Sequence, residues 1–169
     1  FVGGTAFTHK FNLLNPLDTD AAFRLGFTGG ITHNSNGVTP NGINGYGNTF
    51  YSETVHSALN DKHISIYSRL NILGSYTDMA SYNGSNAATD ISPRYFVSGE
   101  RCLMRNGNVA GSNYLNTSSL GFFLNNRIDA SNVRARQNAT LQLIASPSVA
   151  LVNVPYYIGA NNLNGTPGS

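Results

Sequence analysis

Charged side chains are scarce in this sequence. Only 11% of the residues are Asp, Glu, Lys or Arg, against roughly 25% in a typical soluble domain, and the formal net charge is +2. The eight arginines are scattered along the chain, and only Arg134 and Arg136 lie close together. A nucleic-acid groove needs clustered Lys and Arg, so the sequence argues against a protein that binds nucleic acid.

Long apolar runs, cysteine pairs and tryptophan are also missing. No apolar run approaches the roughly 18 residues that a transmembrane helix needs, so membrane insertion is not expected. The single cysteine, Cys102, rules out an internal disulfide framework and a cysteine zinc cluster. We expect it to be a buried, small apolar side chain rather than a nucleophile. The absence of Trp removes the side chain that stacks most strongly on sugars.

Small polar residues take the place of charge. Asn, Gly, Ser and Thr number 23, 18, 17 and 13, together 71 of the 169 residues. They are poor inside helices and good in turns and at strand edges, which excludes a mostly helical protein. With 40% apolar and 11% aromatic residues, the chain is not a disordered tail. Its length predicts a single β-rich domain spanning 1–169, and both ends resemble cuts within a longer polypeptide.

Alternation of apolar and polar residues predicts several short strands. Their close spacing, with Gly and Asn clusters between them, is typical of an antiparallel sandwich or barrel. The strands are expected at residues 22–28, 63–70, 76–82, 94–97, 120–124, 132–136, 141–145 and 154–160. The side chains expected in the core are Phe23, Leu25, Phe27, Ile64, Ile66, Phe122, Leu124 and Ile158.

Turn-forming residues separate several of these strands. Asn-Gly pairs at 83–84, 106–107 and 164–165 favour type I′ hairpin turns, because both central residues can take positive φ. Residues 136–140 lie between two predicted strands and are expected to form a further hairpin. The one helical turn that we expect lies within 53–59.

The stretch 29–48 differs from the rest of the chain. It holds six glycines and five asparagines with few apolar residues, so we expect a long, ordered surface loop whose Asn side chains bond the backbone. The side chains expected to anchor it are Ile31, Val38, Ile43 and Tyr46. A contact surface and a lid over one end of the core are equal alternatives for its role. The candidate contact residues are Asn34, Asn41, Asn44 and Tyr46.

Residues able to carry out catalysis are scattered. A retaining sugar hydrolase needs two carboxylates about 5 Å apart, yet Glu53 and Glu100 stand alone in the sequence. Asp18 and Asp20 lie near a proline, where turn hydrogen bonding is expected. The four histidines lack metal-ligand spacing, and neither a nucleophile elbow nor a phosphate-binding loop is present. A Ser-His-Asp triad needs no adjacency in sequence and stays open. We expect no catalytic residue, no metal site, no cofactor and no enzymatic activity.

Tyrosine and asparagine are the residue types that point to a ligand. Nine tyrosines offer aromatic faces that stack on sugar rings, and amide side chains hold hydroxyl groups. Ordinary packing at the margin of the core is the favoured explanation for any single tyrosine, so the signal for sugar binding is weak. The composition is therefore compatible with glycan binding without requiring it.

Most of the chain resembles a known family. The opening residues 1–6, 9–13 and 16–25, and the loop motifs at 29–37 and 40–49, are similar to a laminin-G-like, concanavalin-A-type domain. Such domains occur in structural and tail-associated proteins of bacteriophages and prophages. Residues 63–69, 120–123 and 157–167 resemble the central and later strands of that domain. The loop and the last motif are the most specific parts of the resemblance.

The resemblance implies an all-β, antiparallel jelly-roll β-sandwich on a virion. The function that it implies is a non-enzymatic spike, fibre or decoration module that packs in the virion or attaches to the host surface. The implied partners are other virion subunits, in a homo-oligomer, and a host-surface glycan. A lectin-like domain of a bacterial extracellular adhesin and a polysaccharide depolymerase are the alternatives. Since the family continues with one more strand, we expect an open sheet edge here, or one that a neighbouring chain completes.

Overall fold

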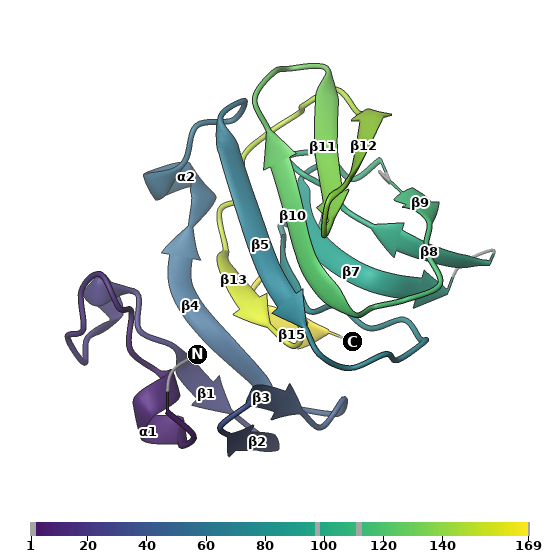
Figure 1. The fold of residues 1–169 in the computed structure, drawn as a ribbon. Coiled ribbons are helices and arrows are strands. Elements are labelled where there is room, and N and C mark those ends of the chain that lie inside the picture. The colour runs from purple at the N-terminus through teal and green to yellow at the C-terminus, as the bar shows by residue number, and fades with distance from the viewer. Residues whose placement is uncertain (1–2, 97–98, 111–112, 169) are drawn as a thin grey trace.

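Strands dominate the computed structural model of the protein, which describes residues 3–96, 99–110 and 113–168 (Figure 1). Strands make up 48% of it and helices 7%, which confirms the prediction of an all-β protein. The helical parts are short turns, namely α1 (Ala6–His9), the 3₁₀ turn η1 (Asp20–Ala22) and α2 (Glu53–His56). The last of them confirms the helical turn expected within 53–59.

The larger of the two main sheets has nine strands. Its main path runs in the spatial order β1 (Gly26–Thr28), β4 (Tyr46–Ser52), β13 (Pro155–Ile158), β6 (Met79–Tyr82), β7 (Ala88–Phe96), β8 (Glu100–Leu103) and β9 (Asn113–Leu115). The hairpin of β14 (Asn161–Leu163) and β15 (Thr166–Gly168) joins it beside β6. The described pairs are antiparallel except for the short contact between β14 and β6.

The smaller main sheet has four antiparallel strands. Their spatial order is β12 (Thr140–Ala145), β11 (Asn132–Gln137), β10 (Gly121–Arg127) and β5 (Lys62–Ser68). Strands β5 and β12 form its two edges, and in the described part of the chain neither has a second strand partner. A separate hairpin of β2 (Ile31–Asn34) and β3 (Gly37–Pro40) is drawn at the foot of Figure 1.

The hydrophobic core lies where the two main sheets face each other. The four-stranded sheet contributes Ile64, Phe123 and Ala135, and the nine-stranded sheet with its adjoining loop contributes Ile91, Cys102, Met104 and Tyr156. Cys102 is fully buried, as expected. Burial raises the pKa of its thiol to about 12, so at neutral pH the side chain is a protonated apolar group rather than a nucleophile.

The prediction of the core was wrong at β10. Phe122 is 39% exposed, whereas its neighbour Phe123 is fully buried. The inward phase of this strand continues with Asn125 and Arg127, which are also fully buried. Because those polar side chains find hydrogen-bond partners inside the protein, the alternation does not mark the buried face here. Of the other side chains expected in the core, Ile64 is buried, and Phe23, Leu25, Phe27, Ile66, Leu124 and Ile158 are half-buried.

The first predicted strand, at 22–28, is only partly present. β1 covers its last three residues, while the chain before it forms η1 and ends that turn at Phe23, whose φ of 56° is left-handed. The apolar side chain at 23 is used for aromatic packing, since its ring lies 4.8 Å from that of His56. The other seven predicted strands match strands of the structure in whole or in part. Val97, at the end of the strand predicted for 94–97, lies outside the described residues.

The stretch 29–48 holds more regular structure than predicted. The hairpin of β2 and β3 and the beginning of β4 lie within it, because several of its glycines and asparagines are accommodated in the strands themselves and the others form the turns between them. Ile31 and Val38 are half-buried, as is Tyr46, which stacks on Tyr157 with ring centroids 4.5 Å apart. Ile43 is exposed, so its predicted role as an anchor was wrong.

Some of the predicted hairpin turns are present in the structure, and others are not. Asn164 and Gly165 form the two-residue turn between β14 and β15 with φ of 50° and 91°, and residues 138–139 join β11 to β12. Residues 83–87 join β6 to β7, in a longer connection than a type I′ turn. The pair 106–107 does not form a hairpin turn, since Asn106 instead pairs with Thr89 of β7.

Candidate functional site

A groove of about 1050 Å³ runs beside the free edge of β5. Residues 34–42, from the hairpin of β2 and β3, form one wall, and residues 65–70 of β5 and the following loop form the other. Residues 76–79, together with Ile158 and Gly159 at the end of β13, complete its lining. The groove therefore combines segments that are far apart in the sequence.

The hairpin wall is held by asparagine side chains. The Oδ1 atom of Asn41 accepts hydrogen bonds from the backbone N–H groups of Ile43, Asn44 and Gly45, at 3.0, 3.1 and 3.0 Å. Its Nδ2 group donates to Oδ1 of Asn44 at 2.9 Å, and that oxygen also accepts the N–H of Gly30 at 3.1 Å. These bonds satisfy turn backbone that would otherwise lack partners, so the wall is an ordered surface.

The predicted contact residues divide between the groove and its support. Asn34 and Asn41 line the groove, whereas Asn44 and Tyr46 are not part of its lining. Asn44 instead fixes the loop, and Tyr46 packs on the larger sheet through its stacking with Tyr157. The structure thus brings together two of the four candidates and gives the other two supporting positions.

One glycine fixes the distance between the hairpin and the larger sheet. Gly159 has φ of 77°, and a Cβ atom added to it would lie 2.1 Å from Cγ of Pro40. A side chain at this position is therefore strained by its backbone conformation and also collides with β3. The close approach of Gly159 to Pro40 sets how wide the groove is at this end.

Two aromatic side chains line the groove and remain accessible. Tyr67, on β5, is 69% exposed, and Tyr76, in the loop before β6, is 50% exposed. They come from different segments of the groove lining and lie among neutral polar side chains, including Asn34, Asn36 and Asn41. Aromatic rings beside amides and hydroxyl groups are suited to a ligand that has both apolar faces and many hydroxyls.

Three charged side chains also line the groove. Burial raises the pKa of Asp78, although a hydrogen bond from Ser68 acts against that shift. Arg94 donates to Glu100 at 2.9 Å and to Asn71 at 3.2 Å, so its charge is already compensated. Arg69 is exposed and has no ion-pair partner within the described ranges.

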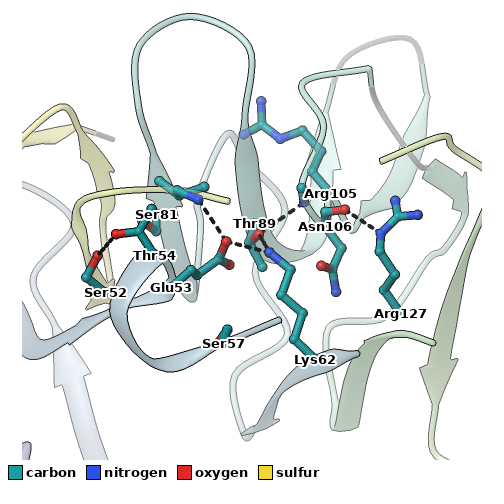
Figure 2. Close-up of polar contacts among 12 residues, drawn as sticks. Ser52, Glu53, Thr54, Ser57, Lys62, Ser81, Thr89, Arg105, Asn106 and Arg127 are labelled. Atoms are coloured by element: carbon teal, nitrogen blue, oxygen red, sulfur yellow. Dashed lines mark hydrogen bonds and ion pairs between the residues drawn. The ribbon is translucent and has the colours of Figure 1, made fainter. Parts of the chain in front are cut away.

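A buried polar network lies between the two sheets (Figure 2). At its centre the fully buried carboxylate of Glu53 accepts hydrogen bonds from the ammonium group of Lys62 and the hydroxyl of Tyr156. It also accepts the backbone N–H of Val152 at 2.9 Å, while Lys62 donates a second bond to Thr89 at 3.1 Å. Figure 2 shows Lys62 extending toward both Glu53 and Thr89. Burial lowers the pKa of Lys62, and the charge of Glu53 acts in the opposite direction.

The network continues toward β10 and the residue that follows β12. The fully buried Asp90 accepts the backbone N–H of Arg105 at 2.8 Å and pairs with the guanidinium of that residue. Asn125 donates to the carbonyl oxygen of Asp90 at 2.8 Å and accepts from the amide group of Asn106 at 3.1 Å. Arg127 donates to the carbonyl oxygens of Asn106 and Ser146 at 2.8 and 2.7 Å. Buried charges are tolerated only when they are paired in this way.

This polar network connects the two sheets and does not form a second ligand site as large as the groove. It connects β5 and β10 to β7, α2 and the chain around 152–156, so it fixes the wall on which Tyr67 lies. Sequence reasoning missed it because Glu53 has no acidic neighbour in the chain. The alternation of side chains along the strands was a usable signal. Lys62 points to the same inward face of β5 as Ile64, and Arg127 points to the same inward face of β10 as Phe123.

The other candidates from the sequence have structural partners. Asp18 and Asp20 pair with Lys10 and Arg24 on the surface, as turn residues rather than as an acid pair. Nδ1 of His9 and Nδ1 of His33 lie 3.1 Å apart. Within residues 3–96, 99–110 and 113–168, no group of three or more His, Cys, Asp or Glu side chains is arranged to hold a metal ion. The helices in those ranges are all too short to span a bilayer.

Comparison of the chain with protein-family models, with curated proteins and with solved structures found no match. The similarity to laminin-G-like domains therefore stays a prediction made from the residues. The candidate site is defined by geometry alone, as an accessible groove with aromatic and amide side chains, supported by a rigid interior.

Proposed function

We propose that this domain is a non-enzymatic attachment module that binds a surface glycan in the groove beside β5. The observation that carries the proposal is the combination of Tyr67 and Tyr76 with Asn34, Asn41 and Asp78 on one open surface. Sugar rings stack on aromatic faces, and amide and carboxylate groups bond their hydroxyls. The two facing sheets agree with the jelly-roll sandwich that we propose for the fold.

The carboxylates around the groove favour binding over cleavage. Glycoside hydrolysis generally uses two carboxyl groups on either side of the scissile bond. Among the groove residues that the structure describes, Asp78 is the one acid. Glu53, which is fully buried and bonded to Lys62 and Tyr156, is occupied elsewhere. A polysaccharide depolymerase is therefore the less favoured proposal.

A virion is the setting that we propose for this attachment. The N-terminal segment exposes four large apolar side chains within residues 7–17, namely Phe7, Leu13, Leu14 and Leu17. Exposed apolar side chains at this density in the sequence support contact with other subunits in a larger assembly such as a homo-oligomeric fibre or spike. A lectin-like bacterial adhesin would use the same groove, and the source of the protein distinguishes the two settings.

The proposal is tested by glycan binding to the folded domain. We expect binding on an array of bacterial surface glycans, and a loss of about tenfold or more in affinity for Tyr76→Ala, since a stacked ring and its buried area are removed. Val149→Ala, which truncates an exposed apolar side chain outside the groove and outside the N-terminal segment, is the control and keeps full affinity. Absence of binding to every glycan, or equal affinity of Tyr76→Ala and the wild type, contradicts the proposal. New reducing ends in the same samples would instead support a depolymerase.

A further inference from the structure

The outer face of the four-stranded sheet carries an ordered grid of exposed side chains. The register places Tyr67 opposite Phe122. The next row of the same face contains Ser65, Leu124, Arg136 and Leu141, and the row after it contains His63, Asn126, Arg134 and Leu143. Rows two residues apart on a strand project from the same face about 7 Å apart. No strand covers this face within the described part of the chain.

This face is apolar and aromatic, and its charge is of one sign. Leu143 is 63% exposed, and Tyr67, Phe122 and Leu141 are also exposed. The sequences of β5, β10, β11 and β12 contain no Asp or Glu, so the charges that project outward are those of Arg134 and Arg136. The face therefore favours a partner that carries negative charge.

The guanidinium groups are available to such a partner. Arg136 is exposed, and its guanidinium group has no ion-pair partner within the ranges that the structure describes. Arg134 is half-buried. Backbone hydrogen bonds from Ser131 and Asn132, each at 2.8 Å, and to a smaller extent the charge of Arg134 lower the pKa of Asp129, so that carboxylate is already occupied by other donors. Arginine binds carboxylates with two parallel hydrogen bonds, so each of these side chains can hold one carboxylate.

The face is continuous with the groove. Ser65 and Tyr67 point outward from β5 and also line the groove, as does Arg69, which directly follows the strand. A ligand that leaves the groove over this edge therefore meets Tyr67 and Phe122 first and the row of Arg136 next. Stacking two copies of the protein by this face is disfavoured, because their arginines would oppose each other.

We propose that the ligand is an acidic polysaccharide whose chain extends from the groove across this outer face. Tyr67 and Phe122 stack on its sugar rings, and Arg136 and Arg134 bind successive carboxylates. This inference rests on the proposed glycan binding and adds the chemical class of the glycan. A polysaccharide is favoured over an acidic protein because the face continues a groove lined by amides, hydroxyls and tyrosines.

The test compares an acidic polysaccharide with the same chain after its carboxyl groups are reduced to alcohols. Polygalacturonate and uronate-containing bacterial polysaccharides are the probes. We expect the wild type to bind the acidic form at least about tenfold more tightly than the reduced form, with affinity that falls as salt is added. Arg136→Gln should lose that preference, while Arg101→Gln keeps it. Arg101 lies on β8, bonded to Asn113, and its substitution changes the net charge equally.

The possible outcomes separate this inference from the proposed function. If no glycan binds, the proposed function fails. If the acidic and reduced forms bind equally and Arg136→Gln has no effect, groove binding stands and the inference is overturned. Polyglutamate is included as a third probe. If it binds as tightly as the polyuronates, the face recognises acidic protein rather than sugar, which also overturns the inference.

Discussion

Glu53 and Tyr156, which are 103 positions apart in the chain, meet in the protein interior, where the tyrosine hydroxyl donates to the carboxylate. Lys62 donates to the same carboxylate, so one acid connects α2, β5 and β13. The three side chains are each 8% exposed or less. Their contact gives the polar interior a fixed geometry, and its removal has a foreseeable cost.

Replacing Glu53 should destabilise the fold strongly. In Glu53→Gln the ammonium group of Lys62 is left buried without a counter-charge, and breaking a buried pair in this way costs about 3–5 kcal/mol. Urea unfolding monitored by circular dichroism measures the loss. The double variant Glu53→Gln/Lys62→Met, which removes the unpaired charge, should recover part of it. A loss below about 1 kcal/mol for the single variant would show that this pair is not a structural centre.

The two adjacent phenylalanines of β10 provide a matched pair. Phe123→Ala removes a fully buried ring and should cost about 3–5 kcal/mol, whereas Phe122→Ala removes a ring that is 39% exposed and should cost clearly less. The free energies of unfolding in urea give the comparison directly. Equal losses, or a larger loss at 122, would mean that the strand presents its other face to the core.

Acid should weaken the contact between α1 and the β2–β3 hairpin. Burial, and then the charge of His33, hold the pKa of His9 below its ordinary value of 6.5. Between that lowered pKa and about 6.5 the unfolded chain binds more protons than the folded one, so stability falls as pH decreases through this window. The melting temperature, followed from about pH 7.5 to about pH 5, should decrease more steeply for the wild type than for His9→Gln. Parallel curves would contradict the prediction.

Asn41 should support the groove wall by its oxygen atom. Asn41→Ala leaves three backbone N–H groups without their acceptor, and each lost bond costs about 0.5–1.5 kcal/mol. We expect faster amide exchange and proteolysis within residues 41–45, with a smaller change in the melting of the whole domain. Asn41→Asp keeps the acceptor but loses the donor to Asn44, so it should restore only part of the protection of the loop. Unchanged exchange in Asn41→Ala would contradict this supporting role of the side chain.

How far the sequence predicts this fold depends on where polar residues lie. The strand at 63–70 was found because its inward positions, Ile64 and Ile66, are apolar and its outward ones are mostly polar. The buried face of β10 was not identified because apolar residues lie on both faces of the strand around Phe122. The face that is buried also carries the polar residues Asn125 and Arg127. Alternation identifies a buried face only if that face is apolar.

The candidate site shows a similar division. Asn34 and Asn41 were identified because glycine-rich and asparagine-rich turns have a local signature. Tyr67, Tyr76 and Asp78 were not assigned to the same surface. No local sequence pattern predicts that β5 and the loop before β6 both lie beside the hairpin of β2 and β3. That information lies in the pairing of strands distant in the sequence.

The contact between Gly159 and Pro40 shows that some positions in this domain fix the backbone, whereas others only determine the surface. Any side chain at 159 would move the hairpin, and with it every residue of that wall, so this glycine constrains the frame. Asn34, Ser35 and Asn36, at the tip of the hairpin, are exposed, and substitutions there alter the surface without disturbing the frame. The tip of the hairpin can therefore change its surface chemistry through a few substitutions, while the glycine at the base holds the wall in place.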